Sequence, residues 1–187
     1  TYNRMGVFQM ENGKNENYEV FNMFKDRWAL VAAGDMENHN ACTVGWGSMG
    51  TLWSRPGHDG KSVIVYLHPS RYTRQLVQNS DYFTVSFFPD EYKKALGYMG
   101  SHSGRNEDKA AGAGLTPVEM GESIGFKEAQ LTFVCRKLYQ HLLSKDDLAP
   151  EIQEYYKNNQ KAFPLDENGD WQPHWVFVGE VTDIVRK

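Results

Sequence analysis

The sequence predicts a mainly β domain, a closed barrel with helices attached to it. Short strand-like runs separated by turn residues outnumber the helical segments, and no internal repeat or linker interrupts the chain. A chain of 187 residues suits one domain, and 40% hydrophobic residues supply enough material for a core. We expect a polar, Asn-rich arm over residues 1–22, followed by the domain over residues 23–187.

Two strand-like runs near the start predict an antiparallel pair. Residues 28–33 are mostly apolar and end at Gly34, and residues 41–46 follow a polar turn over 35–40. Residues 63–67 are apolar on both faces, which indicates a largely buried strand.

The later strands show clearer alternation. Apolar residues 83, 85 and 87 alternate with Thr84 and Ser86, which predicts a half-buried strand with these two side chains on the solvent face. Residues 129–143 are long and extended, and residues 175–185 form the last strand.

Three helices are expected. Residues 72–79 and 90–99 are helical in pattern, and Leu148, Ile152 and Tyr155 or Tyr156 lie at helical spacing with Pro150 in the first turn. A small-residue loop over residues 100–114 lies between the second and third of these helices.

Composition excludes several classes of protein. The net charge is −4 and the basic residues are scattered, which argues against nucleic-acid binding or attachment to an acidic membrane. No apolar stretch is long enough to cross a membrane. Cys42 and Cys135 show no metal-binding spacing and the six histidines are dispersed, so we expect no metal site and a reducing, cytoplasmic setting.

A first candidate binding segment is the glycine-rich stretch 43–51. Glycines let the backbone approach a planar ligand, and its amides can reach ring carbonyl groups. Trp46 offers a flat wall, and Ser48 and Thr51 offer hydroxyl groups. The alternative is a tight loop after a strand, with Trp46 in the core.

A second candidate is the segment 68–74, where a buried strand meets a helix. The first amides of a helix attract phosphate, Arg71 adds a bidentate donor, and Ser70 and Thr73 can each donate a hydroxyl hydrogen. The alternative makes Ser70 only a helix cap and Arg71 a solvated charge.

The third candidate is the loop 100–109, which contains hydroxyl groups, flexible backbone and the cations Arg105 and Lys109. Asn106 is able to cap a short turn toward Ala111. The loop matches neither a P-loop nor a dinucleotide fingerprint. Its alternative is a mobile, solvated surface loop.

Taken in order, the three segments resemble the flavin reductase-like FMN-binding split barrels, which include flavoredoxins. The stretch 103–109, Ser-Gly-Arg-Asn-Glu-Asp-Lys, is similar to the Ser-Gly-Arg-x-x-Asp-Lys signature of that family, and Gly179-Glu180-Val181 matches its closing strand. Two positions depart from the family: Gly45 precedes the tryptophan where Ser is common, and Ala110 stands where an aromatic residue is common.

The resemblance implies a six-stranded antiparallel split barrel of Greek-key topology that works as a homodimer, with each FMN near the subunit interface. It implies that the isoalloxazine ring and ribityl chain contact one segment, made of Trp46, Gly47, Ser48, Met49, Gly50 and Thr51. It further implies that Ser70, Arg71 and Thr73 hold the phosphate. Ser103, Gly104 and Lys109 would close the site. No catalytic acid is assigned; His102 is a possible proton donor or only a solvent-facing loop residue.

The activity expected from the resemblance is an NAD(P)H-dependent flavin reductase that passes electrons to a small-molecule or protein acceptor. In such enzymes the flavin supplies the chemistry and the protein positions it. One alternative is a flavoredoxin-type electron carrier reduced by a protein partner. Another is a flavin-binding module without nicotinamide activity. Cys42, beside the first candidate segment, could act as a redox thiol. The alternative is a small buried apolar residue, which is the more common role of a lone cysteine in a strand.

Overall fold

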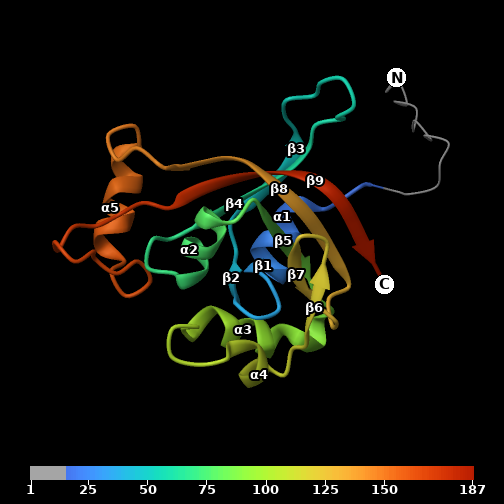
Figure 1. The fold of residues 1–187 in the computed structure, drawn as a ribbon. Coiled ribbons are helices and arrows are strands. Elements are labelled where there is room, and N and C mark those ends of the chain that lie inside the picture. Colours follow the sequence, from blue (N-terminus) through green and yellow to red (C-terminus); the bar gives the residue numbers. More distant parts are fainter. Residues whose placement is uncertain (1–15) are drawn as a thin grey trace, which may run out of the picture.

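The computed structural model describes residues 16–187, and its main element is an antiparallel sheet of seven strands (Figure 1). Across the sheet the strands follow the order β2-β1-β5-β8-β9-β4-β3. Their bounds are β1 Ala29–Gly34, β2 His39–Val44, β3 Gly47–Thr51, β4 Lys61–Leu67, β5 Tyr82–Phe87, β8 Leu131–Leu142 and β9 Trp175–Arg186. The predicted mainly β class is confirmed, and so is the antiparallel pairing of the first two strands.

Strands β2 and β3 stand at opposite edges of this sheet, yet only two residues separate them in the chain. Val44 ends β2, Gly47 begins β3, and Gly45 and Trp46 join them. Because three peptide units span at most about 11 Å, this link draws the two edges together. The sheet therefore curls into a barrel that is split between β2 and β3.

The barrel encloses one apolar cluster, and a second cluster lies outside it. The inner side chains that are less than 2% exposed include Val31, Val63, Val65, Phe83, Val85, Phe87 and Phe177. The outer cluster contains Leu30, Ala32, Leu96, Met99, Ile124 and Phe126. Strand β1 contributes to both clusters, because its alternate side chains point to opposite faces.

Helices and a hairpin cover the outer cluster. They are the 3₁₀ turn η2 Asp90–Tyr92, α3 Lys93–Ser101, α4 Lys109–Ala113 and the two-stranded sheet of β6 Pro117–Met120 and β7 Ser123–Phe126. The sequence reasoning did not identify the hairpin. It also expected six strands, whereas the main sheet has seven and the hairpin adds two more.

The hairpin explains why one expectation was wrong. Thr84 and Ser86 were predicted on the solvent face, but both are fully buried. Thr84 Oγ1 donates to the carbonyl of Ile124 in β7, at 2.6 Å, and Ser86 Oγ is hydrogen-bonded to Thr132 Oγ1 at 2.9 Å. Alternation of polar and apolar residues cannot distinguish a solvent face from a buried face whose hydroxyl groups are satisfied.

The remaining helices flank the barrel. A short α1 Val20–Asn22 continues into the π-helical turn η1 Met23–Arg27, α2 Tyr72–Asn79 follows β4, and α5 Pro150–Asn158 lies in the long connection between β8 and β9. The helix at 72–79 is confirmed, and Pro150 does occupy the first turn of α5. Residues 1–15 of the predicted arm lie outside the described residues. Its boundary stays a prediction.

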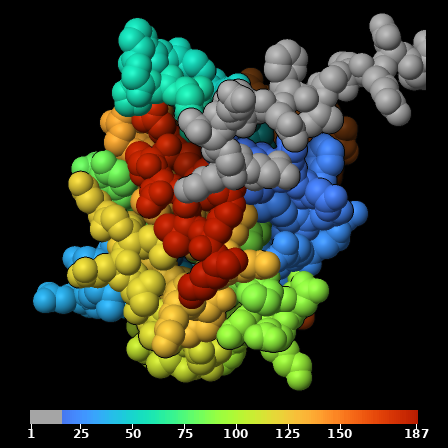
Figure 2. Space-filling model, turned by 90° about the vertical axis from the view of Figure 1, so that its right-hand side faces the viewer, coloured from blue at the N-terminus to red at the C-terminus, as the bar shows by residue number. Residues whose placement is uncertain are grey.

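The loop predicted over residues 100–114 contains helix α4. Its N-cap is Asp108, whose side chain accepts a hydrogen bond from the amide of Ala111 at 3.1 Å; the cap expected at Asn106 was wrong. No helix within residues 16–187 is long and apolar enough to cross a membrane. Figure 2 shows β9 in red crossing one side of the molecule, with the loop between β3 and β4 projecting above it.

Candidate functional site

Two neighbouring hollows flank the link between β2 and β3. The larger is a groove of about 780 Å³, and the smaller is a cavity of about 250 Å³. The residues that line both are Gly45, Trp46, Tyr66, Tyr155 and His174. The larger volume is in the range of small-molecule sites, which are typically about 300–1,000 Å³.

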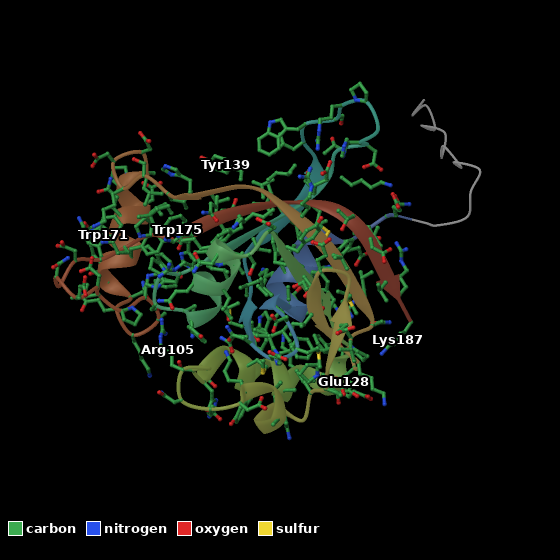
Figure 3. The ribbon with its side chains drawn as sticks, in the orientation of Figure 1. Arg105, Glu128, Tyr139, Trp171, Trp175 and Lys187 are labelled. Carbon is green, nitrogen blue, oxygen red and sulfur yellow. The ribbon has the colours of Figure 1, made fainter. Side chains whose placement is uncertain are left out.

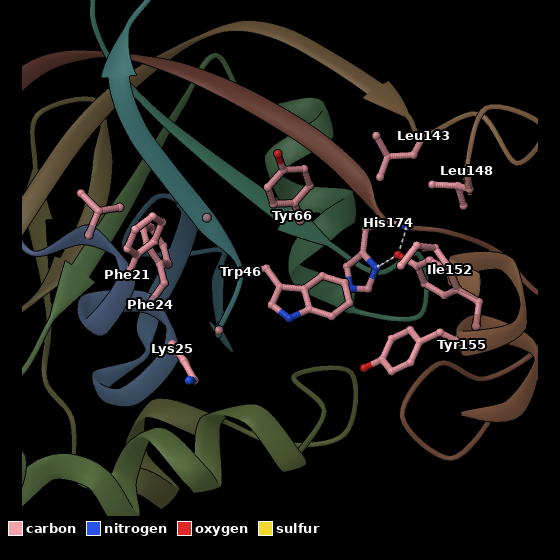
Figure 4. A pocket seen from close by; sticks show the side chains of 14 residues that line it. Phe21, Phe24, Lys25, Trp46, Tyr66, Leu143, Leu148, Ile152, Tyr155 and His174 are labelled. Atoms are coloured by element: carbon pink, nitrogen blue, oxygen red, sulfur yellow. Dashed lines mark hydrogen bonds between the residues drawn. The ribbon is translucent and has the colours of Figure 1, made fainter. Parts of the chain in front are cut away.

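Trp46 stands between the two hollows with 41% of its surface exposed (Figure 4). Its ring centroid is 4.4 Å from that of His174 and 5.8 Å from that of Phe163. Tyr155 of α5 lies 6.3 Å away on the same side. Trp46 is therefore an accessible aromatic surface, and its alternative place in the core is excluded by its exposure.

The conformation of the link depends on Gly47. A Cβ atom at this position would lie 2.2 Å from Cε1 of Phe24, so only glycine allows β3 to pack this closely on η1. Phe24 is 3% exposed and packs edge-on against Phe87 in the barrel interior. The position of Trp46 is thus fixed because the next residue, Gly47, packs against Phe24 of the core.

The start of helix α2 supplies the smaller cavity with a cation. Arg71 occupies the N-cap position, lines the cavity, and donates from Nη1 to the carbonyl of Gly100 at 2.8 Å. No side chain caps this helix, so Ser70 is not the cap that the sequence suggested. Ser70 instead places Oγ 2.8 Å from His68 Nδ1. The amide of Arg74 donates to the carbonyl of Arg71 at 3.1 Å, and the amides of Tyr72 and Thr73 in the first turn of α2 remain available as donors.

Asn40 in β2 connects two of the segments that the sequence singled out, 68–74 and 100–109. Its Nδ2 donates to Oγ1 of Thr73 at 2.9 Å, and Thr73 is fully buried. Gly104 lies against the same amide, because a Cβ there would be 2.2 Å from Asn40 Oδ1. Strand β2, helix α2 and the loop before α4 therefore meet around one side chain.

Lys109 is buried beside this contact, with 4% of its surface exposed. Its Nζ donates to the carbonyl of Met99 at 2.8 Å, and burial lowers the pKa of the ammonium group, helped by the charge of Arg71. Cys42 is also buried here, and burial raises the pKa of its thiol. A protonated thiol is a poor nucleophile, which favours a packing role for Cys42.

Four cations gather around the start of α2 without carboxylate partners. None of the ion pairs within residues 16–187 includes Arg71, Arg74, Arg105 or Lys109. Arg105, labelled in Figure 3, donates to the carbonyl of Ser70 at 3.2 Å. In a chain of net charge −4, this is a local excess of positive charge that suits an anion.

The structure does not bring all the predicted residues into the site. Trp46 and Gly47 line the groove, but the residues that follow along strand β3 line neither hollow; these are Ser48, Met49, Gly50 and Thr51. The last three of these line a different groove of about 420 Å³, beside Tyr18 and Lys61. Ser103 lies in the loop before α4, where its Oγ accepts a hydrogen bond from the amide of Arg105 at 3.3 Å.

Sequence reasoning missed the aromatic cluster that closes the site. It contains His68, Tyr155, Tyr156, Phe163 and His174, and all of these except His68 come from the connection between β8 and β9. The two imidazole centroids are 5.3 Å apart although the residues are far apart in the chain. The only signal in the sequence was the concentration of aromatic residues between 155 and 175.

Both histidines of this cluster are neutral in the folded protein. Burial lowers the pKa of His68 to about 4 and that of His174 to about 3, with the charge of Arg71 acting in the same direction. The His68 Nε2–H donates to the carbonyl of Gln172 at 3.1 Å, so its Nδ1 accepts from Ser70.

Comparison with known proteins gives a consistent set of likenesses. The family model described as "Flavin reductase like domain" matches residues 21–187. No curated protein sequence matches the chain. An FMN-binding protein from Thermus thermophilus is similar in structure, with a TM-score of 0.64 and 19% identity over 98% of this chain and 82% of that one.

Two flavoredoxin structures are also similar. The flavoredoxin of Methanosarcina acetivorans has a TM-score of 0.62 at 20% identity, and that of Desulfovibrio vulgaris (Miyazaki F) has 0.60 at 21% identity. Each alignment covers 94% of this chain and 76% of the other. At such identities the likeness establishes the fold, a split barrel.

The contact between Asn40 and Gly104 leads to a stability prediction. Gly104→Ala forces a methyl group onto the Asn40 amide, which Thr73 holds in place, and we expect a loss of about 1–3 kcal/mol in the free energy of unfolding. The double variant Asn40→Ala, Gly104→Ala should lose less than the sum of the two single variants, because the methyl group then has room. Urea unfolding measures all four proteins, and additive losses would contradict the contact.

The buried histidines predict a dependence of stability on pH. The unfolded chain binds protons at His68 and His174 below about pH 6.5, whereas the folded protein does so only near pH 4 and 3. Stability should therefore fall as the pH drops from about 6.5 to about 4, by up to about 1.4 kcal/mol per pH unit for each histidine. Urea unfolding at several pH values in this range gives the free energy of unfolding as a function of pH. That free energy should fall less steeply with falling pH in the double variant His68→Gln, His174→Gln than in the wild type. An equally steep fall in both proteins would contradict the lowered pKa values of the two histidines.

Proposed function

The chain belongs to the flavin reductase-like domain family, and from that premise we propose that it is an FMN-binding oxidoreductase, an NAD(P)H-dependent flavin reductase that passes electrons to an acceptor. Bound FMN supplies the chemistry, because it can accept two electrons from a nicotinamide and release them again. The residues described above would bind it, orient its ring and set the charge around it. The observation that supports this most is the group of unpaired cations at the start of α2.

The phosphate end of FMN fits the donors present there. Arg71 offers a guanidinium group, and the amides of Tyr72 and Thr73 at the start of α2 offer N–H donors. Lys109 is a buried ammonium group whose one hydrogen bond to a described residue goes to a backbone carbonyl. Thr73 and Ser103 lie in α2 and in the loop before α4, the two segments that meet at Asn40. A phosphate dianion would compensate charges that no carboxylate within residues 16–187 neutralises in an ion pair.

The ring of FMN would lie against the link between the two edge strands. Trp46 presents an exposed indole face, and the backbone of Gly45 and Gly47 can approach a ring without interference from side chains. His174 packs against Trp46 with its ring tilted and lines both hollows. The proposed ring contacts therefore centre on residues 45–47. Ser48 to Thr51 would act indirectly, because their pairing with β4 holds strand β3 and the link before it in place.

Two cations near the bound group would affect its redox behaviour. Arg71 and Lys109 would stabilise an anionic reduced flavin over the neutral form, on grounds of charge pairing. Cys42 would stay a protonated thiol, because burial raises its pKa. No acid for proton transfer is assigned: His102 is exposed and stacks on Tyr98 at 3.7 Å, outside both hollows.

One observation favours a second candidate function, a flavoredoxin-type electron carrier. The larger groove is lined almost entirely by apolar and aromatic side chains, and Lys25 is the only charged residue among those described that line it. A dinucleotide carries several phosphate groups, which usually require more cations than one. A protein partner would need only an exposed apolar surface beside the flavin.

We also propose that the protein works as a homodimer with FMN near the interface. Large hydrophobic side chains are exposed around the groove: Phe21 is 90% exposed, and Trp46, Ile152 and Tyr155 are each more than 40% exposed. Apolar patches of this kind commonly mark protein–protein contacts.

Replacing Arg71 tests where the phosphate binds. We expect Arg71→Ala to weaken FMN binding about tenfold to a hundredfold, the loss typical of a hydrogen bond to a charged group, and to leave riboflavin binding unchanged because riboflavin has no phosphate. Flavin fluorescence titration measures both ligands. Lys127→Ala, which removes an exposed cation beyond β7, is the matched control. Equal losses for FMN and riboflavin would place the phosphate elsewhere.

The reductase and the carrier are separated by an anaerobic visible spectrum of the FMN-loaded protein. Rapid bleaching of the flavin absorbance after addition of NADPH or NADH is the result expected for the reductase. Retained flavin that neither nicotinamide bleaches, but a reduced protein partner does, would establish the carrier instead. Failure to retain any flavin after desalting would contradict its role as a tightly bound group.

A further inference from the structure

A tyrosine on helix α5 and the histidine before β9 form a buried pair at the site. Tyr156 is 2% exposed and His174 is 7% exposed. The tyrosine hydroxyl oxygen lies 2.5 Å from His174 Nδ1 and 3.2 Å from the backbone nitrogen of the same histidine. Both contacts hold the Tyr156 side chain against His174 at the edge of the groove.

The direction of these hydrogen bonds follows from the groups present. The backbone N–H of His174 can only donate, so the tyrosine oxygen accepts from it. The hydroxyl hydrogen of Tyr156 then has one acceptor among the described residues, His174 Nδ1. An Nδ1 that accepts a hydrogen bond carries no proton, and a neutral imidazole must then carry its proton on Nε2.

We propose that Tyr156 is a positioning residue that holds His174 in the Nε2–H tautomer, so that the imidazole offers a hydrogen-bond donor to an acceptor atom of the ring bound beside Trp46. The acceptor is a carbonyl oxygen or an unprotonated ring nitrogen. This inference rests on the proposed function for its ligand, whereas the tautomer itself is a property of the protein alone.

His174 is the histidine of the cluster whose donor remains available. The Nε2–H of His68 is used by the carbonyl of Gln172, at 3.1 Å. No described residue forms a hydrogen bond with Nε2 of His174, whose ring lines both hollows and packs against Trp46 at an interplanar angle of 43°. Figure 4 shows the imidazole between the indole of Trp46 and the side chains of α5.

The surroundings keep the imidazole neutral. The titratable and charged groups around it come from three sides. Tyr66, His68 and Arg71 lie on the β4–α2 side, Lys25 lies in the groove, and Tyr155 and Tyr156 lie on α5. None of the described residues lining either hollow is an aspartate or glutamate that could stabilise an imidazolium ion. Burial lowers the pKa of His174 to about 3, so the neutral donor persists throughout the physiological pH range.

Helix α5 is anchored in a way that fixes the tyrosine. The Tyr156 ring stacks on Trp171 at 5.8 Å and packs against Phe163 at 5.2 Å. The neighbouring Tyr155 points differently: it is 43% exposed and makes only ring contacts with the cluster. The adjacent pair therefore provides a test residue and a matched control of identical chemistry.

The tautomer can be read directly from the nitrogen chemical shifts of His174 in apoprotein labelled with ¹⁵N-histidine, the signals being assigned by comparison with His174→Gln. We expect an unprotonated Nδ1 and a protonated Nε2 in the wild type and in Tyr155→Phe. In Tyr156→Phe we expect a mixture of tautomers or a proton on Nδ1. A proton on Nδ1 in the wild type, or an unchanged tautomer in Tyr156→Phe, would overturn the positioning role.

Titration of the same samples with FMN tests the donor role. The Nε2–H signal of wild-type His174 should shift on binding, and Tyr156→Phe should bind FMN about three- to tenfold more weakly, the loss of one hydrogen bond. FMN binding with an unshifted His174 signal would overturn the donor role and leave the proposed function intact. No FMN binding at all would overturn the proposed function and the donor role together, while the tautomer result would stand.

Discussion

The two-residue link between β2 and β3 is the constraint on which the rest of the structure depends. These strands lie at opposite edges of a seven-stranded sheet, so joining them through Gly45 and Trp46 obliges the sheet to curl. The curl encloses the apolar cluster and leaves the link on the outside, where it cannot be covered by the sheet. Gly47 then packs against Phe24, and this contact sets the position of the exposed indole beside it. The two hollows exist because the split in the barrel lies at this place.

A second constraint brings together the groups for which we propose anion binding. Asn40 in β2 contacts Thr73 of α2 and Gly104 of the loop before α4, so segments distant in the chain share one buried amide. Around it the protein concentrates cations that no carboxylate neutralises in an ion pair within the described residues, which is unfavourable unless an anion binds there. Arg71 is common to both regions, since it contacts the carbonyl of Gly100 and lines the cavity beside Trp46. Arg71 thus places the cation group beside the link, and these are the two ends of the proposed site.

Much of the fold could be predicted from local pattern, and the site only in part. The strand at 63–67 was predicted from a run that is apolar on both faces, and the helix at 72–79 from the local pattern that follows it; the structure confirms both. Burial of Thr84 and Ser86 could not be predicted, because it depends on a hairpin more than 30 residues away along the chain. The meeting of His68 and His174 depends on the pairing of β4 with β9, which no local pattern reveals. The structure confirms that residues 68–74 form a strand–turn–helix junction, whose phosphate-binding role stays a prediction that rests on the general properties of such junctions.

The claim that these residues form one FMN site is tested most directly by a crystal structure of the protein with FMN. We expect the phosphate to accept hydrogen bonds from the Arg71 guanidinium group and the first amides of α2. The claim also requires the isoalloxazine ring to lie against Trp46 and the backbone of residues 45–47. A phosphate bound instead in the groove beside Lys61 and Thr51, or a ring remote from Trp46, would contradict it.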